Sequence, residues 1–107
     1  MPKYILVAMN GPTSGEGDLE TYNRWYEEVH IPDLLSVEGI TSARRFEVVR
    51  GKVPGAPDLW PYVALYEIET DDLAKISQGM QTQCRPFDPT FDRSNSAHLF
   101  CLQVSES

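Results

Sequence analysis

The sequence has little cysteine and little histidine, the side chains from which most zinc sites are built. Only two of each occur among 107 residues, and Cys84 and Cys101 lack C-x-x-C spacing. There is no H-E-x-x-H motif and no Cys/His cluster. We therefore expect no metal site, and cysteines that are small buried apolar residues rather than a disulfide.

Basic charge and long apolar runs are also scarce. Nine Lys+Arg against 16 Asp+Glu give a net charge of -7, which opposes binding to nucleic acid or to an anionic lipid surface. No stretch approaches the roughly 20 apolar residues of a membrane span, and the apolar start is too short for a signal peptide. These absences predict a cytoplasmic protein without nucleic-acid or membrane partners.

Glycine-rich phosphate loops and nucleophile elbows are missing as well, which disfavours a nucleotide cofactor and covalent hydrolysis. What is present is the size and composition of one globular domain over residues 1–107, with 41% hydrophobic and 23% charged residues. A chain this short buries only roughly 60–70% of its unfolded surface, so a partner subunit can complete the core.

The apolar pattern predicts alternating strands and helices. Strands are expected at residues 3–10, 40–50, 62–68 and 97–104, and helices at residues 18–30 and 71–83, with Asp18 as the first N-cap. Pro32 is expected to break or kink the first helix near His30, before one more turn. Residues 51–58 form a long connection, and Phe87 and Phe91 fix the last loop. The β-α-β-β-α-β order predicts an α+β, ferredoxin-like fold with a four-stranded antiparallel sheet.

The last predicted strand is apolar on both of its faces. Phe100, Leu102 and Val104 alternate with Leu99 and Cys101, whereas two helices on one face of a sheet cover only that face. A second copy packed on the open face across a two-fold axis would bury the remainder. We therefore expect a homodimer.

The first helix carries the residues best suited to chemistry. Tyr22, Tyr26 and His30 follow one another at four-residue spacing, which places them on one helix face. His30 is either a cation that stabilises the negative end of the helix or, in a half-buried aromatic pocket, a general base or acid. The spacing leaves both interpretations open.

The pattern W-Y-x-x-x-H-I-P-D-L-L at residues 25–35, followed by G-I-x-x-A-R-R-F at residues 39–46, resembles the EthD-like group of the dimeric α/β-barrel superfamily. The resemblance covers most of the chain. It implies a homodimer whose sheets form a barrel, small apolar or aromatic substrates, often no metal or organic cofactor, and a cavity-facing histidine that matches His30. The superfamily includes muconolactone-type isomerases, polyketide cyclases, cofactor-free monooxygenases and haem-degrading enzymes, so the fold does not select the reaction.

Two adjacent arginines supply a candidate oxyanion site. Arg44 and Arg45 must point to opposite faces of their strand. One is expected in solvent or paired with a helix carboxylate such as Glu28, and the other in the cavity, where its planar fork suits a carboxylate, phenolate or enolate. The alternative is that both reach solvent at the strand end.

Further residues are candidates for substrate binding. A tyrosine can be a core residue or can orient a carbonyl, and His98 can be structural or can share acid and base roles with His30. The candidate substrate-binding residues are Tyr22, Trp25, Tyr26, Tyr66, His98 and Phe100.

Two function hypotheses follow. The first is a cofactor-independent isomerase, cyclase or lyase acting on a small aromatic or polyketide-like compound. In it His30 transfers the proton, Arg44 or Arg45 stabilises the developing anion, and Tyr26 and Tyr66 place the ring. The alternative is a non-catalytic carrier of a small hydrophobic metabolite. A cofactor-free monooxygenase, or a haem protein with His30 or His98 as axial ligand, is a weaker possibility.

Overall fold

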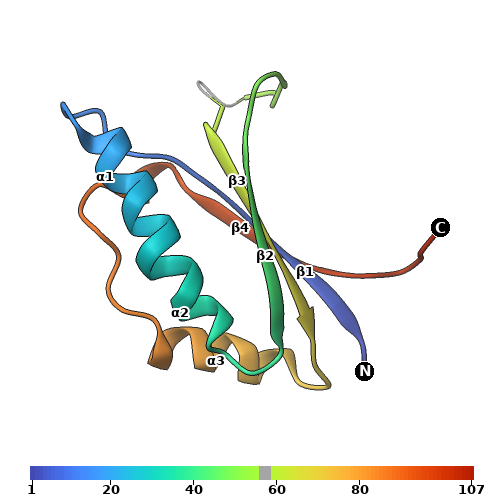
Figure 1. Cartoon of the computed structure of the whole chain (residues 1–107). Helices are drawn as coiled ribbons and strands as arrows, with labels where there is room; N and C mark the ends of the chain where they lie inside the picture. The colour runs from blue at the N-terminus through green and yellow to red at the C-terminus, as the bar shows by residue number, and fades with distance from the viewer. Residues whose placement is uncertain (56–58) are drawn as a thin grey trace.

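The computed structural model describes residues 1–55 and 59–107 and has the predicted βαββαβ order. The antiparallel sheet has the strand order β2-β3-β1-β4, and the helices lie on one of its faces (Figure 1). This is a ferredoxin-like α+β fold. The elements are β1 (Lys3–Asn10), α1 (Asp18–Trp25), η1 (Tyr26–His30), α2 (Ile31–Leu35), β2 (Ile40–Glu47), β3 (Tyr62–Glu69), α3 (Leu73–Gln83), η2 (Arg93–Asn95) and β4 (Ala97–Leu102).

The strands follow the predictions, with shorter ends on both edge strands. β2 stops at Glu47 rather than at residue 50, and a single bond from the Val48 N–H to the Pro61 carbonyl (2.8 Å) continues the pairing. Pro61 has no N–H to return. β4 stops at Leu102 because its neighbour β1 begins at Lys3. Of the predicted connection 51–58, residues 56–58 lie outside the described part of the chain.

The first helix was predicted to break or kink near His30 and then to make one more turn: the break is wrong, whereas the further turn is present as α2. α1, η1 and α2 form one continuous helix, and Ile31 keeps helical angles (φ −61°, ψ −48°) in front of Pro32. η1 is a π-helical turn in which the Ile31 N–H bonds to the Tyr26 carbonyl, five residues back. Pro32 has no backbone N–H to donate to the preceding turn. A π turn contains one extra residue, and with it the helix continues past Pro32 without ending.

Asp18 does not cap the first helix as predicted, because it is already the first helical residue. Gly17 holds the cap position with φ 81°, a left-handed conformation that favours glycine. The Asp18 carboxylate instead accepts hydrogen bonds from the Gly15 N–H (2.9 Å) and the Thr13 hydroxyl, which closes the preceding loop. The second predicted helix begins at Leu73 rather than at residue 71, with Asp72 as N-cap.

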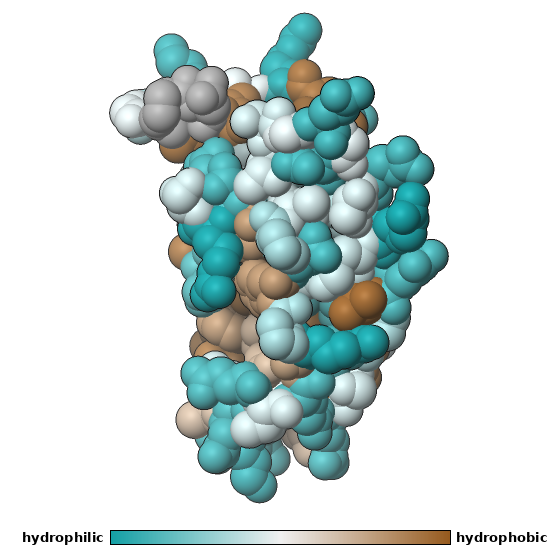
Figure 2. Space-filling view, turned by 90° about the vertical axis from the view of Figure 1, so that its left-hand side faces the viewer, coloured by the Kyte–Doolittle hydropathy of each residue, from teal (hydrophilic) through white to brown (hydrophobic). Residues whose placement is uncertain are grey.

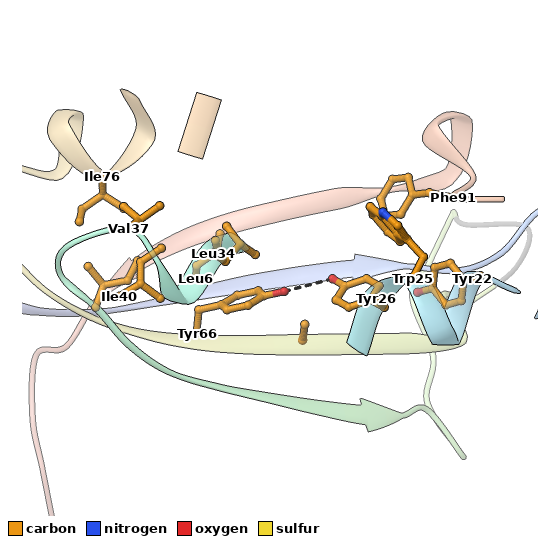
Figure 3. Packing of buried hydrophobic residues seen from close by; sticks show 12 residues of the cluster. Leu6, Tyr22, Trp25, Tyr26, Leu34, Val37, Ile40, Tyr66, Ile76 and Phe91 are labelled. Carbon is orange, nitrogen blue, oxygen red and sulfur yellow. Dashed lines mark hydrogen bonds between the residues drawn. The ribbon is translucent and has the colours of Figure 1, made fainter. Parts of the chain in front are cut away.

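The core lies between the helices and the inner face of the sheet (Figure 3). Tyr22, Tyr26 and Tyr66 are completely buried there, together with Leu6 and Ile76. Figure 2 shows the side formed by α1 and the connection after α3, where apolar side chains (brown) lie between polar ones (teal). Every helix in residues 1–55 and 59–107 is too short or too polar to span a bilayer.

The outer face of the sheet has no helix over it and is apolar at its centre. Val7 pairs with Leu65 of β3 and with Leu99 of β4, and alternation along the strands directs all three away from the helices. Leu99 is 55% exposed in the single chain. Cys101 lies on the same face and is exposed, so the prediction that it is buried is wrong for the isolated chain. Val104 follows β4 instead of belonging to it.

Candidate functional site

A cavity of about 500 Å³ opens between the inner face of the sheet, the η1–α2 part of the long helix and the segment that leaves α3. The sheet contributes Asn10, Tyr66 and Phe100, and the helix contributes Tyr26 and His30. The remaining wall comes mainly from the connection between α3 and β4. Most of the wall is apolar or aromatic, as expected of a small-molecule site.

His30 is held in this wall by aromatic rings on three sides. It stacks on Trp25 (4.7 Å between centroids, 20° between planes) and meets the rings of Tyr26 (4.9 Å) and Phe87 (5.0 Å) edge to face. Burial lowers the pKa of His30 to about 4, against an opposing effect of Asp33. Its Nδ1 is buried without a hydrogen-bond partner among the described residues. The imidazole is therefore neutral at pH 7.

The alternative of His30 as a helix-terminal cation does not fit this geometry. The helix continues for another five residues through α2, and burial favours the uncharged ring. Tyr26 and His30 are the first and last residues of the π turn, and both line the cavity. Short π segments are frequent at functional sites.

A hydrogen-bonded group of tyrosines forms the polar part of the wall. Tyr22 donates to Oδ1 of Asn10, and the Asn10 amide donates to the Tyr26 hydroxyl (3.3 Å). The Tyr66 hydroxyl also donates to the Tyr26 hydroxyl (3.4 Å; dashed line in Figure 3). Burial raises the pKa values of Tyr22 and Tyr66, so both stay protonated. Tyr26 therefore accepts twice, and its own hydroxyl hydrogen has no acceptor among the described residues.

Of the two arginines, only Arg45 points toward the helix. Its guanidinium lies 4.2 Å from the centre of the Tyr26 ring, donates to the Asn23 side chain (2.9 Å) and comes within 4.0 Å of Glu27. The helix carboxylate beside it is thus Glu27, not Glu28. Tyr26 stands between Arg45 and the cavity, so Arg45 supports the wall from behind and does not line it.

Arg44 lies on the opposite face of the sheet. It is exposed, and its nearest carboxylate is Glu67 of β3 at 3.8 Å. A substrate in the cavity of the same chain is therefore out of its reach, and we remove Arg44 from the oxyanion role.

A buried carboxylate fastens the last segment of the wall. The Asp33 side chain accepts bonds from the Arg85 backbone N–H (2.8 Å), from its Nε and from its terminal nitrogen (2.8 Å). These bonds lower the pKa of Asp33 and raise that of Arg85. Sequence reasoning missed this pair, because Asp33 and Arg85 are 52 positions apart and neither belongs to a local motif.

The other candidate residues divide into two groups. Tyr66, His98 and Phe100 line the cavity, whereas Tyr22 and Trp25 lie in the core behind its wall. Phe87 and Phe91 fix the last loop as predicted, with ring centroids 4.6 Å apart. The backbone of Phe91 also forms an isolated antiparallel β-bridge with Pro12.

Sequence reasoning also missed Asn10. A buried asparagine at the end of an apolar strand was the available signal, since a buried amide requires partners.

In the part of the chain that the structure describes, the cysteines and acidic residues are not gathered into a metal site. Cys84 and Cys101 are free thiols. Within residues 1–55 and 59–107, no three or more His, Cys, Asp or Glu side chains gather where they can hold a metal ion.

Comparison with known proteins gives structural neighbours alone: no family model and no curated protein matches the sequence. HapK from Hahella chejuensis superimposes with a TM-score of 0.57 at 12% identity, over 100% of this chain and 98% of that one. A dimeric ferredoxin-like protein of unknown function from Jannaschia sp. CCS1 gives 0.51 at 19% identity, over 92% and 96%.

An EthD (ethyl tert-butyl ether D) family protein from Bacillus halodurans C-125 gives a TM-score of 0.48 at 16% identity, over 77% of this chain and 74% of that one. At these identities the likeness concerns the fold alone. This chain has the ferredoxin-like fold, and the EthD-like group that its sequence resembles is represented among the similar structures.

Proposed function

We propose that the protein is an enzyme that moves a proton on a small aromatic or polyketide-like compound bound in the cavity, with His30 as the base. The observation that carries the proposal is a neutral, buried imidazole on the wall of an aromatic cavity. Proton transfer requires a base and a group that stabilises the developing anion, and the side chains of this protein can supply both.

Tyr26 is the proposed partner of His30. When a base removes a proton beside a carbonyl, negative charge develops on the carbonyl oxygen. The free hydroxyl hydrogen of Tyr26 can donate to that oxygen, and the bonds from Asn10 and Tyr66 to the Tyr26 oxygen hold the hydroxyl in place. In this proposal Tyr26 takes over the anion-stabilising role that the sequence assigned to an arginine. The reaction class is an isomerisation, cyclisation or lyase step.

The second candidate is a carrier that binds the same class of compound without reaction. The pKa of about 4 favours it, because so weak a base has little driving force for proton removal. In a carrier, the rings around His30 contribute apolar contact, and the hydroxyl of Tyr26 fixes the orientation of the ligand.

We further propose that the protein acts as a homodimer joined through the outer face of the sheet. The exposed apolar side chains on that face, Leu99 and Phe46 among them, support the pairing. The protein from Jannaschia sp. CCS1, which has the same fold, is described as dimeric. The cavity lies on the other face of the sheet, so each copy keeps its own.

The two candidate functions differ in whether they accelerate deuterium exchange. The probe is 2-tetralone, an aromatic ketone with exchangeable C–H bonds beside its carbonyl, followed by NMR in D₂O. An enzyme accelerates the exchange, and His30→Gln removes about 10²-fold or more of the acceleration. Arg24→Gln, at an exposed position outside the cavity lining, is the control and keeps the rate. Binding of 2-tetralone without acceleration supports the carrier instead.

A further inference from the structure

The cavity wall differs in charge from the rest of the chain. The chain has 16 Asp+Glu and a net charge of -7. The residues that line the cavity nevertheless include two arginines and two histidines and no aspartate or glutamate. Asp33, the nearest carboxylate to Arg85, is bonded to it and is not part of the lining.

The two arginines differ in what they can do. Arg85 is occupied by Asp33, whereas Arg93 has no carboxylate within 4.0 Å among the described residues. The Arg93 guanidinium lies 5.4 Å from the centre of the Phe87 ring, and that ring contacts His30 at 5.0 Å. Arg93 is exposed on η2, near the start of β4, which carries His98. Arg93 and His30 thus both contact the ring of Phe87, and the charge of Arg93 is available to a ligand.

We infer that the compound bound in the cavity carries an acidic oxyanion group, such as a carboxylate, and that Arg93 binds it. This inference rests on the proposed function and names the chemistry of one end of its ligand. The aromatic part lies against Phe87 and Phe91, and the anionic group reaches the rim.

Two physical arguments support an anion at this rim. A guanidinium presents parallel N–H donors that match the two oxygens of a carboxylate, and such charge-assisted pairs are stronger than neutral hydrogen bonds. The carboxylates elsewhere on the surface are screened by salt beyond about 10 Å, so the net negative charge of the chain does not cancel a local cation.

The experiment compares 2-naphthoate with its uncharged counterpart 2-naphthamide by isothermal titration calorimetry. The intact protein is expected to bind the carboxylate about tenfold or more tightly than the amide. Arg93→Gln removes this preference and leaves the affinity for the amide unchanged, while Arg93→Lys keeps part of it. Arg24→Gln, which deletes the same charge at an exposed position of α1 that does not line the cavity, is the matched control and retains the full preference.

Equal affinity for the two probes in the intact protein overturns the inference, as does a preference that survives Arg93→Gln. Binding of the amide then still supports the aromatic cavity of the proposed function. If neither probe binds and 2-tetralone exchange is not accelerated, the proposed function fails together with the inference. Circular dichroism of each variant confirms that the comparison is made between folded proteins.

Discussion

The guanidinium of Arg45 lies over the ring of Tyr26, with its central carbon 4.2 Å from the ring centre. The ring centres of Tyr62 and Tyr22 are 5.1 and 5.5 Å from the same carbon. Arg45 therefore occupies an aromatic cage of three tyrosine rings, and one of the three, Tyr26, also lines the cavity. Arg45, which does not line the cavity, thus positions Tyr26, which does.

Replacing Arg45 with lysine should destabilise the protein by about 1–2 kcal/mol. Lysine keeps the charge but loses the planar contact with the tyrosines and the bond to Asn23. Urea denaturation measures the loss as a lower midpoint at unchanged slope. The control is Arg44→Lys on the exposed face, which should change the free energy of unfolding by less than about 0.5 kcal/mol. Equal effects at the two positions would contradict the cage.

The sequence predicted that Arg44 and Arg45 point to opposite faces, because strand side chains alternate. It did not predict which face each takes. That depends on the register between β2 and β3, in which Arg45 pairs with the buried Ala64 and Arg44 with Leu65. A shift by one residue exchanges the two arginines, and only long-range pairing fixes the register.

Removing the Tyr26 hydroxyl should cost about 1–3 kcal/mol of stability. In Tyr26→Phe the Asn10 amide and the Tyr66 hydroxyl both lose their acceptor in a buried site. Tyr66→Phe should cost less, because it removes a donor and leaves Tyr26 bonded to Asn10. Tyr4→Phe, on the same strand as Asn10 but only partly buried, serves as the control. A smaller loss for Tyr26→Phe than for Tyr66→Phe would contradict the assigned direction of these bonds.

Asp33→Asn should loosen the segment that follows α3. The neutral amide loses the charge-assisted bonds to Arg85, and because Arg85 is largely exposed and screened by water we expect only a modest loss of overall stability. Hydrogen exchange should accelerate at the backbone N–H of Arg85, which donates to Asp33. Glu20→Gln breaks the exposed pair with Arg24 and should leave both readouts nearly unchanged.

The pH dependence of stability should report the burial of His30. Its pKa is about 4 in the folded chain and near 6.5 when unfolded, so the unfolded state binds the proton more tightly. Stability is therefore complete above pH 6.5 and falls as the pH drops from 6.5 to 4, by about 3 kcal/mol. Asp33 has a lowered pKa and adds its own loss only at more acidic pH.

Urea denaturation across pH 4–6.5 measures this dependence. In His30→Gln the free energy of unfolding should become nearly independent of pH in that window. Lys75→Gln, at an exposed position of α3, should retain the dependence of the parent chain. A parent chain whose stability is flat between pH 4 and 6.5 would show that His30 is not buried in its neutral form.

Local patterns predicted the order of strands and helices, the bounds of β1 and the position of His30 beside Tyr26. They did not predict the π turn, because proline before the end of a helix usually signals a break, and here one extra residue in the preceding turn replaced the break. The roles of Asn10 and of the Asp33–Arg85 pair were not predicted, for a different reason. Their partners are distant in sequence, so tertiary packing alone brings them together.

The last prediction concerns the outer face of the sheet, where apolar residues of three strands meet at Val7, Leu65 and Leu99. If a second copy covers this face, folding is linked to association, and the melting temperature rises with protein concentration. Leu99→Glu places a charge in the interface and should give a species near 12.1 kDa in analytical ultracentrifugation. Val49→Glu introduces the same side chain at a position already 89% exposed and should remain dimeric. A parent chain that stays folded and monomeric at micromolar concentration would rule out this interface, since one that buries about 2,000 Å² of apolar surface is stable there.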